Sequence, residues 1–83
     1  LGSVRLRLKL YESAREAYER ATRLSPGRAS AWRGLARTEF ELGELERARA
    51  ALERALALDP ADELARELQR RLAARGSNAA SGD

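Results

Sequence analysis

The sequence of 83 residues predicts an all-α fold, a short solenoid built from helix–turn–helix units. Its composition favours helices, because leucine and alanine dominate, charged residues make up 35% and glycine and proline are few. The chain also repeats itself with a period of 34 residues, the length of one pair of helices in stacked helical arrays. A chain of this length forms at most one small domain.

The repeat becomes visible when the chain is shifted by 34 positions. Ten of the nineteen residues in 8–26 are then identical to their counterparts in 42–60. The residues of the first copy that match are Leu8, Glu12, Ala14, Arg15, Ala17, Glu19, Arg20, Ala21, Leu24 and Pro26. The chain is therefore divided into a partial first unit, residues 1–28, and a complete unit, residues 29–62.

Residues 4–10 are the ambiguous element, because apolar and basic residues alternate there as in a half-buried strand. Their copies 34 residues later fall inside an expected helix, so we expect a truncated first helix instead. Leu6 and Leu10 then lie on an apolar face, which a preceding helix or a partner should cover. Because the chain has no methionine, we expect it to be a fragment, a processed product or the ordered part of something longer. So short an array is expected to need support from further repeats, a partner or self-association.

Three segments show the three-and-four spacing of amphipathic helices, namely 11–24, 31–42 and 45–58. Pro26 and Gly27 are expected to end the first of them. Gly43 can supply the left-handed residue of the turn between the other two. Trp32 is expected to pack between these two helices as a core residue rather than to stack on a ligand.

A last helix is predicted over residues 61–75, where Leu64, Leu68 and Leu72 recur every four residues. Asp59 before Pro60 is a typical helix start, with the acid as the cap and proline at the first position. The polar remaining faces of this helix suit the cap of a solenoid. Residues 76–83 are small and polar, and we expect them to be disordered.

A set of signature residues recurs in both units at fixed spacing. In the complete unit they are Trp32, Leu35, Ala36, Gly43, Ala48, Leu52, Ala55 and Pro60, and in the partial unit Ala14, Tyr18, Ala21 and Pro26. This pattern resembles the tetratricopeptide repeat. The resemblance implies a right-handed superhelix of paired helices A and B, with about one and a half repeats and a capping helix here. Lys9 departs from the pattern at the first turn, and Glu39 replaces the usual tyrosine of helix A.

A second relative, the half-a-tetratricopeptide repeat, shares several of these features. It resembles the chain at Trp32, Ala36, Glu39, Ala48, Arg49, Glu53, Arg54 and Ala55. That resemblance implies a subunit of an RNA-processing or RNA-stabilising assembly. Arg5 stands where its first repeat needs an acid, so the plain tetratricopeptide repeat is favoured.

Composition excludes several function classes. The chain has no cysteine and no histidine, so thiolate metal sites, imidazole ligands and the commonest general base are absent from it. We expect no cofactor, no metal, no catalytic residue and no membrane partner, and hence no enzyme. Residues 1–28 have a net charge of +4, which suits either an anionic partner such as RNA or a solvated surface of ion pairs.

The resemblance also implies a site, because the inner faces of A helices in this family line a groove that holds an extended peptide or a partner helix. The residues placed there are Ser30, Arg33, Gly34, Arg37, Phe40 and Glu41, with Ser3, Leu6 and Arg7 from the first unit and Glu67 and Arg71 from the last helix. Arg33 and Arg37 lie one turn apart and can hold one carboxylate or phosphate together. In the alternative, they only pair with Glu41 or Glu67.

The sequence thus predicts a non-enzymatic scaffold or adaptor that binds a protein partner, either in the groove or at an open N-terminal end. RNA within a larger assembly is the alternative partner. Self-association through the N-terminal end is a further expectation.

Overall fold

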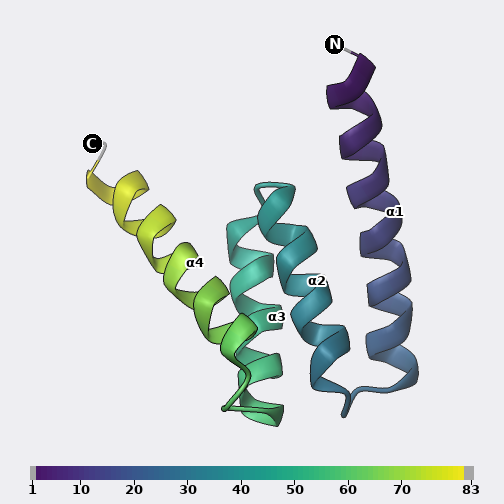
Figure 1. Cartoon of the computed structure of the whole chain (residues 1–83), viewed down its shortest axis with the longest axis vertical. Helices are drawn as coiled ribbons and strands as arrows, with labels where there is room; N and C mark the ends of the chain where they lie inside the picture. Colours follow the sequence, from purple (N-terminus) through teal and green to yellow (C-terminus); the bar gives the residue numbers. More distant parts are fainter. Residues whose placement is uncertain (1, 82–83) are drawn as a thin grey trace.

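The computed structural model describes residues 2–81, with side chains described for residues 5–75. These residues form four helices: α1 (Gly2–Leu24), α2 (Ala29–Glu41), α3 (Leu45–Leu58) and α4 (Glu63–Ser81). In Figure 1, α1 and α4 lie at the two edges, with α2 and α3 between them. Each helix packs against the next along the chain, and α2 also contacts α4. The predicted all-α helical repeat is confirmed.

The core lies where α2, α3 and α4 meet. Its buried residues are Leu35, Ala36, Phe40, Ala48, Ala51, Leu52, Ala65, Leu68 and Leu72. The alanines let the helices approach closely, while leucine and phenylalanine fill the space between them. Trp32 is partly buried against this core, and its indole N–H donates to the carbonyl of Pro26 at 2.8 Å. Trp32 is therefore a packing residue, as expected.

The turn between α2 and α3 depends on Gly43, which has a φ of 82°. This left-handed conformation costs glycine nothing but disfavours residues with a Cβ. The N–H groups of Leu42 and Gly43 donate to the last carbonyls of α2, each at 3.0 Å. The predicted role of Gly43 is confirmed.

α1 is one uninterrupted helix of 23 residues. The repeat pattern instead predicts the end of a helix A and the start of a helix B near residue 9. The difference has a local cause, because Lys9 occupies the repeat position of Gly43. A left-handed lysine costs about 1–2 kcal/mol, so the helix continues through this position. The alternating residues are helical and do not form a strand.

α4 differs from its predicted bounds at both ends. It begins at Glu63 rather than at residue 61, because Asp62 is the capping residue and accepts hydrogen bonds from the N–H groups of Leu64 and Ala65 at 3.1 and 3.4 Å. Asp59 instead accepts from the N–H of Ala61, which closes a turn around Pro60. The helix continues to Ser81, beyond residue 75, because residues 76–81 contain no proline to stop it. The expected disorder of residues 76–83 stays a prediction, and residues 82 and 83 lie outside the described residues.

Candidate functional site

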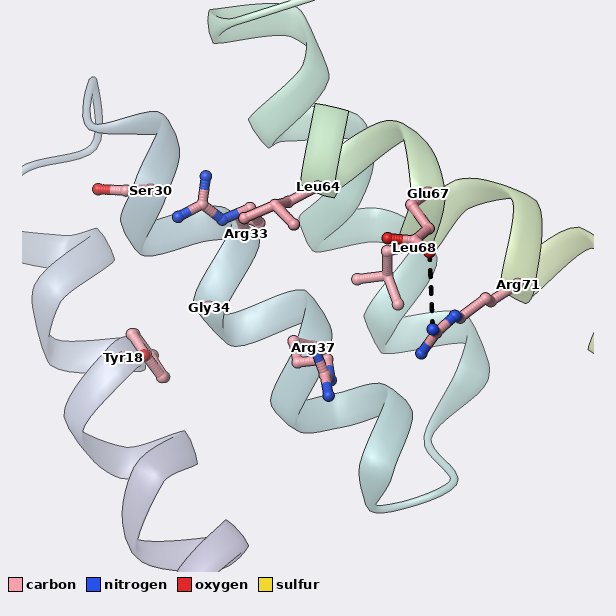
Figure 2. A pocket seen from close by; sticks show the side chains of 9 residues that line it. All are labelled: Tyr18, Ser30, Arg33, Gly34, Arg37, Leu64, Glu67, Leu68 and Arg71. Atoms are coloured by element: carbon pink, nitrogen blue, oxygen red, sulfur yellow. Dashed lines mark ion pairs between the residues drawn. The ribbon is translucent and has the colours of Figure 1, made fainter. Parts of the chain in front are cut away.

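A hollow of about 300 Å³ opens between α1, α2 and α4. Figure 2 shows the side chains that line it, with α2 between the other two helices. The lining residues are Tyr18, Ser30, Arg33, Gly34, Arg37, Leu64, Glu67, Leu68 and Arg71. Three of them are arginines and one is a glutamate, so the lining has a net positive charge.

The floor of the hollow is one face of α2. Ser30, Arg33, Gly34 and Arg37 follow one another at steps of three, one and three, which places them along one side of a helix. Gly34 lies against the ring of Tyr18, and a Cβ at this position would overlap that ring. The glycine therefore allows α1 to approach α2 closely and brings the tyrosine to the edge of the hollow.

The two walls differ in chemistry. Tyr18 of α1 forms one wall and is 37% exposed. Leu64 and Leu68 of α4 contribute apolar surface to the opposite wall, where Leu64 is largely exposed and Leu68 is buried. A ligand in this hollow meets apolar side chains at both walls and guanidinium groups along the floor.

Arg33 is already committed to a partner. Its Nη1 donates to Oδ2 of Asp62 at 2.6 Å, and the two side chains are 33% and 9% exposed. Burial alone would raise the pKa of Asp62, but the hydrogen bond from Arg33, the backbone N–H groups of Ala65 and Leu64 and the charge of Arg33 together hold this pKa below its ordinary value. Arg33 thus fixes α4 to α2, and its charge is largely compensated.

Arg37 and Arg71 are held only by exposed partners on their own helices. Arg37 pairs with Glu41 at 3.2 Å and Arg71 with Glu67 at 3.6 Å, each four residues apart. Exposed pairs of this kind contribute well under 1 kcal/mol. An incoming carboxylate can displace either glutamate at little cost, so these two guanidinium groups are the available cations of the hollow.

The comparison with known families now bears on this arrangement. A family model described as "Tetratricopeptide repeat" matches residues 1–63, about three quarters of the chain. The chain belongs to the tetratricopeptide repeat family. Members of this family generally mediate protein–protein interactions and are typically non-enzymatic scaffolds. The match does not confirm the half-a-tetratricopeptide subfamily, and a search of curated proteins finds no match.

Within this tetratricopeptide repeat, the structure brings part of the predicted residue set together. Ser30, Arg33, Gly34, Arg37, Glu67 and Arg71 all line the hollow. Arg37 pairs with Glu41, as expected if these arginines only form ion pairs on the surface. Arg33 instead pairs with Asp62, a partner that the sequence did not predict.

Other predicted residues lie elsewhere. Phe40 is buried in the core, with the guanidinium of Arg75 4.9 Å from the centre of its ring, so it offers no apolar surface to a ligand. Glu41 lies at the end of α2, where it accepts from Arg37 and from the hydroxyl of Tyr11 at 3.4 Å. Leu6 and Arg7 are exposed residues of α1 that do not line the hollow, because α1 does not turn back at Lys9.

The lining residues that sequence reasoning missed are Tyr18, Leu64 and Leu68. The repeat pattern assigns Tyr18 to the core, because its counterpart Leu52 is a core position. A signal was present in Gly34, since a glycine inside a helix often marks a place where a neighbour approaches closely. Among the residues that the structure describes, no group of side chains is suited to hold a metal ion, and no helix is long and apolar enough to span a membrane.

Proposed function

We propose that this tetratricopeptide repeat is a non-enzymatic interaction module whose hollow binds an extended, acidic peptide segment of a protein partner. The observation that carries the proposal is the lining itself, in which arginines of α2 and α4 lie beside the apolar side chains of Tyr18 and Leu64. Concave surfaces of helical solenoids are their usual binding faces. The family relationship supports a protein partner in general, and the charge of the lining supports an acidic one.

Each part of the hollow has a role in this proposal. Arg37 and Arg71 exchange their glutamate partners for carboxylates of the peptide, with the planar guanidinium groups suited to bidentate pairing. Tyr18 and Leu64 contact apolar side chains of the peptide between its acids. Arg33 acts indirectly, because its pair with Asp62 holds the wall of α4 in place.

RNA as the alternative partner has less support. RNA binding on single strands relies on aromatic side chains that stack with bases. The chain has four aromatic residues, and two of them, Trp32 and Phe40, pack with the core. Protein recognition is therefore the function that the site supports best, with residues 29–62 as the complete repeat that supplies the floor.

An unbiased peptide selection tests this function. A library of random displayed peptides is selected on the immobilised chain, and the enriched peptides are measured by fluorescence anisotropy. We expect enrichment of aspartate and glutamate next to apolar residues, and affinity that falls as salt rises. Selected peptides without acidic enrichment would contradict the proposal.

Charge reversal then locates the site. Arg37→Glu with Arg71→Glu should weaken binding of a selected peptide at least about tenfold, since two charge-assisted contacts are replaced by repulsion. The matched control is Arg47→Glu with Arg49→Glu, the same change of charge at two exposed residues of α3 outside the hollow. Equal losses in both double variants would mean that only the net charge matters, and the hollow would not be the site.

A further inference from the structure

The N-terminal half of α1 extends beyond the rest of the fold. Figure 1 shows it projecting past the turn between α2 and α3. Leu6, Leu8 and Leu10 on this half are 60%, 47% and 62% exposed. Among the described residues, α1 packs against α2 alone. The projecting half is therefore an apolar helix surface without a neighbour.

The repeat shows which face of α1 is uncovered. Ala17 is exposed, whereas its counterpart Ala51 in α3 is 4% exposed. Tyr18 is 37% exposed, whereas its counterpart Leu52 is 2% exposed. α3 packs against its own helix A, which is α2, as well as against α4. Residues 11–24 of α1 have the sequence of a helix B, but among the described residues no preceding helix A packs beside them.

The missing cover is present in the sequence of α1 itself. Leu6 and Leu8 are the repeat counterparts of Phe40 and Leu42, which belong to the end of helix A in the complete repeat. Lys9 prevents these residues from turning back onto their own helix B, because it stands at the position of Gly43. The helix A segment and the helix B face that it should cover are thus held apart on one straight helix.

We propose that two copies of this chain pair through α1, each supplying the helix A segment that covers the other's helix B face. The two α1 helices lie antiparallel, and the two-fold axis passes near Lys9. Lys9 is the repeat counterpart of Gly43, which forms the turn between α2 and α3. Exchange of an identical element between two copies is a low-cost route to a dimer. The proposal does not rest on the peptide site, because α1 contributes only Tyr18 to the lining of the hollow and Tyr18 is not part of the seam.

The pattern of side chains on α1 fits this pairing. Leu6, Leu10, Ser13 and Ala17 follow one another at steps of four, three and four, which is the spacing of a helix–helix seam. All four residues are exposed in the single chain. A seam centred near residue 9 places Leu6 of one copy opposite Ser13 of the other, with Leu10 close to the axis.

Charges beside the seam are complementary. Arg5 and Lys9 flank it near the N-terminus, and Glu12 and Glu16 flank the same side one and two turns later. An antiparallel arrangement brings Arg5 of each copy between Glu12 and Glu16 of the other, while the two Lys9 residues lie beside each other near the axis. A parallel arrangement would instead place like charges together, so the charge pattern selects the antiparallel pair.

The oligomeric state is the first test. Light scattering on the 83-residue chain should give twice the chain mass, with dissociation on dilution. Leu6→Glu with Leu10→Glu should weaken the dimer about a hundredfold or more, because four leucines leave the seam. The control Leu24→Glu changes a leucine of α1 that is 76% exposed and lies beyond the paired segment, and it should leave the dimer intact. A monomer at every concentration overturns the proposal, as does a dimer that resists the double change.

The hinge gives the second test. Lys9→Gly with Leu10→Glu copies the Leu-Gly-Glu turn of the complete repeat into the first one. This variant should fold back on itself and become a monomer with unchanged helix content in circular dichroism. Persistence of the dimer in this variant would show that α1 exchange does not hold it together.

Crosslinking tests the register, and the absence of cysteine makes the chain suited to it. Leu6→Cys and Ser13→Cys are made as separate variants, mixed and mildly oxidised. The mixture should form a disulfide-linked pair of the two variants. Each variant alone should not, because its cysteines lie about 10 Å apart in the antiparallel pair, beyond the reach of a disulfide. Equal crosslinking of one variant with itself would overturn the register.

Discussion

The carboxylate of Asp62 caps α4 and at the same time pairs with Arg33 of α2. One oxygen accepts from the N–H of Leu64 at 3.1 Å, and the other accepts from the guanidinium of Arg33 at 2.6 Å. A single side chain thus begins one helix and fastens it to another. The position of the α4 wall relative to the α2 floor depends on this residue.

Substitution of Asp62 should separate its two roles. Asp62→Asn keeps an oxygen for the cap but loses the charge, so we expect the free energy of unfolding to fall by about 1 kcal/mol. Asp62→Ala removes both interactions, and we expect a loss of about 2–3 kcal/mol. Urea unfolding followed by Trp32 fluorescence measures both values. Equal losses in the two variants would mean that the charge accounts for the whole effect.

The lowered pKa of Asp62 predicts a dependence of stability on pH. In the folded chain the pKa of the Asp62 carboxyl lies below its ordinary value of 3.8, so ionisation of this group favours the folded state. This contribution is fully present above the unfolded pKa and is lost as the pH falls through the folded pKa. The difference in unfolding free energy between the wild-type chain and Asp62→Asn should shrink as the pH falls from 7 towards 3. A difference that stays constant over this range would contradict the assignment.

Gly34→Ala should have opposite effects on stability in the presence and in the absence of the Tyr18 ring. Gly34→Ala in the wild-type chain forces the tyrosine ring aside and should lower the free energy of unfolding, since overpacking costs about 1–3 kcal/mol. In the Tyr18→Ala background the same change should raise stability by up to about 1 kcal/mol, because alanine favours a helix more than glycine does. Thermal unfolding of the four proteins in this cycle gives the coupling. Additive effects would show that the ring moves away freely.

Arg15 of α1 pairs with Glu39 of α2 at 3.3 Å, and the two ends of the pair are unequally buried. The side chain of Glu39 is 4% exposed and that of Arg15 is 26% exposed. Arg15→Ala should therefore cost more, about 2–3 kcal/mol, because it leaves a buried carboxylate without its partner. Glu39→Ala should cost less, since the freed guanidinium can reach water. Chemical unfolding of both variants decides the order, and the reverse order would contradict the role of burial.

Substitution by alanine should affect the free energy of unfolding differently at the two turn glycines, Gly43 and Gly27. Gly43 has a φ of 82°, so Gly43→Ala should lower the free energy of unfolding by about 1 kcal/mol. Gly27 does not have a positive φ, and a Cβ there would meet no atom within 4 Å. Gly27→Ala should leave stability unchanged or raise it by about 0.5 kcal/mol. Similar losses at both positions would show that Gly43 is not required for its backbone conformation.

The periodic features of the fold could be predicted from the sequence. The shift of 34 residues placed α2 and α3, the turn at Gly43 and the core positions of Ala48 and Leu52 correctly. These features depend on local spacing and on the conformational preference of one residue. The face of α2 that lines the hollow was implied by the family resemblance, and helical spacing puts Arg33 and Arg37 on one side of that helix.

Features that depend on contacts between distant residues could not be predicted in this way. The pair of Arg33 with Asp62 joins residues 29 positions apart, and no spacing rule connects them. Phe40 was assigned to the groove, although the packing of α4 and Arg75 buries it. The continuity of α1 was the most informative exception, because the departure at Lys9 was visible in the sequence while its effect on the helix was not inferred.

The unequal support of the two walls of the hollow has a consequence for exchange of amide hydrogens. α4 contacts both α2 and α3, whereas α1 contacts α2 alone among the described residues. In a linear array of this kind, local opening begins at the element with the fewest neighbours. The amides of the projecting N-terminal half of α1 should therefore exchange first in the single chain, before those of the half that packs on α2 and carries Tyr18.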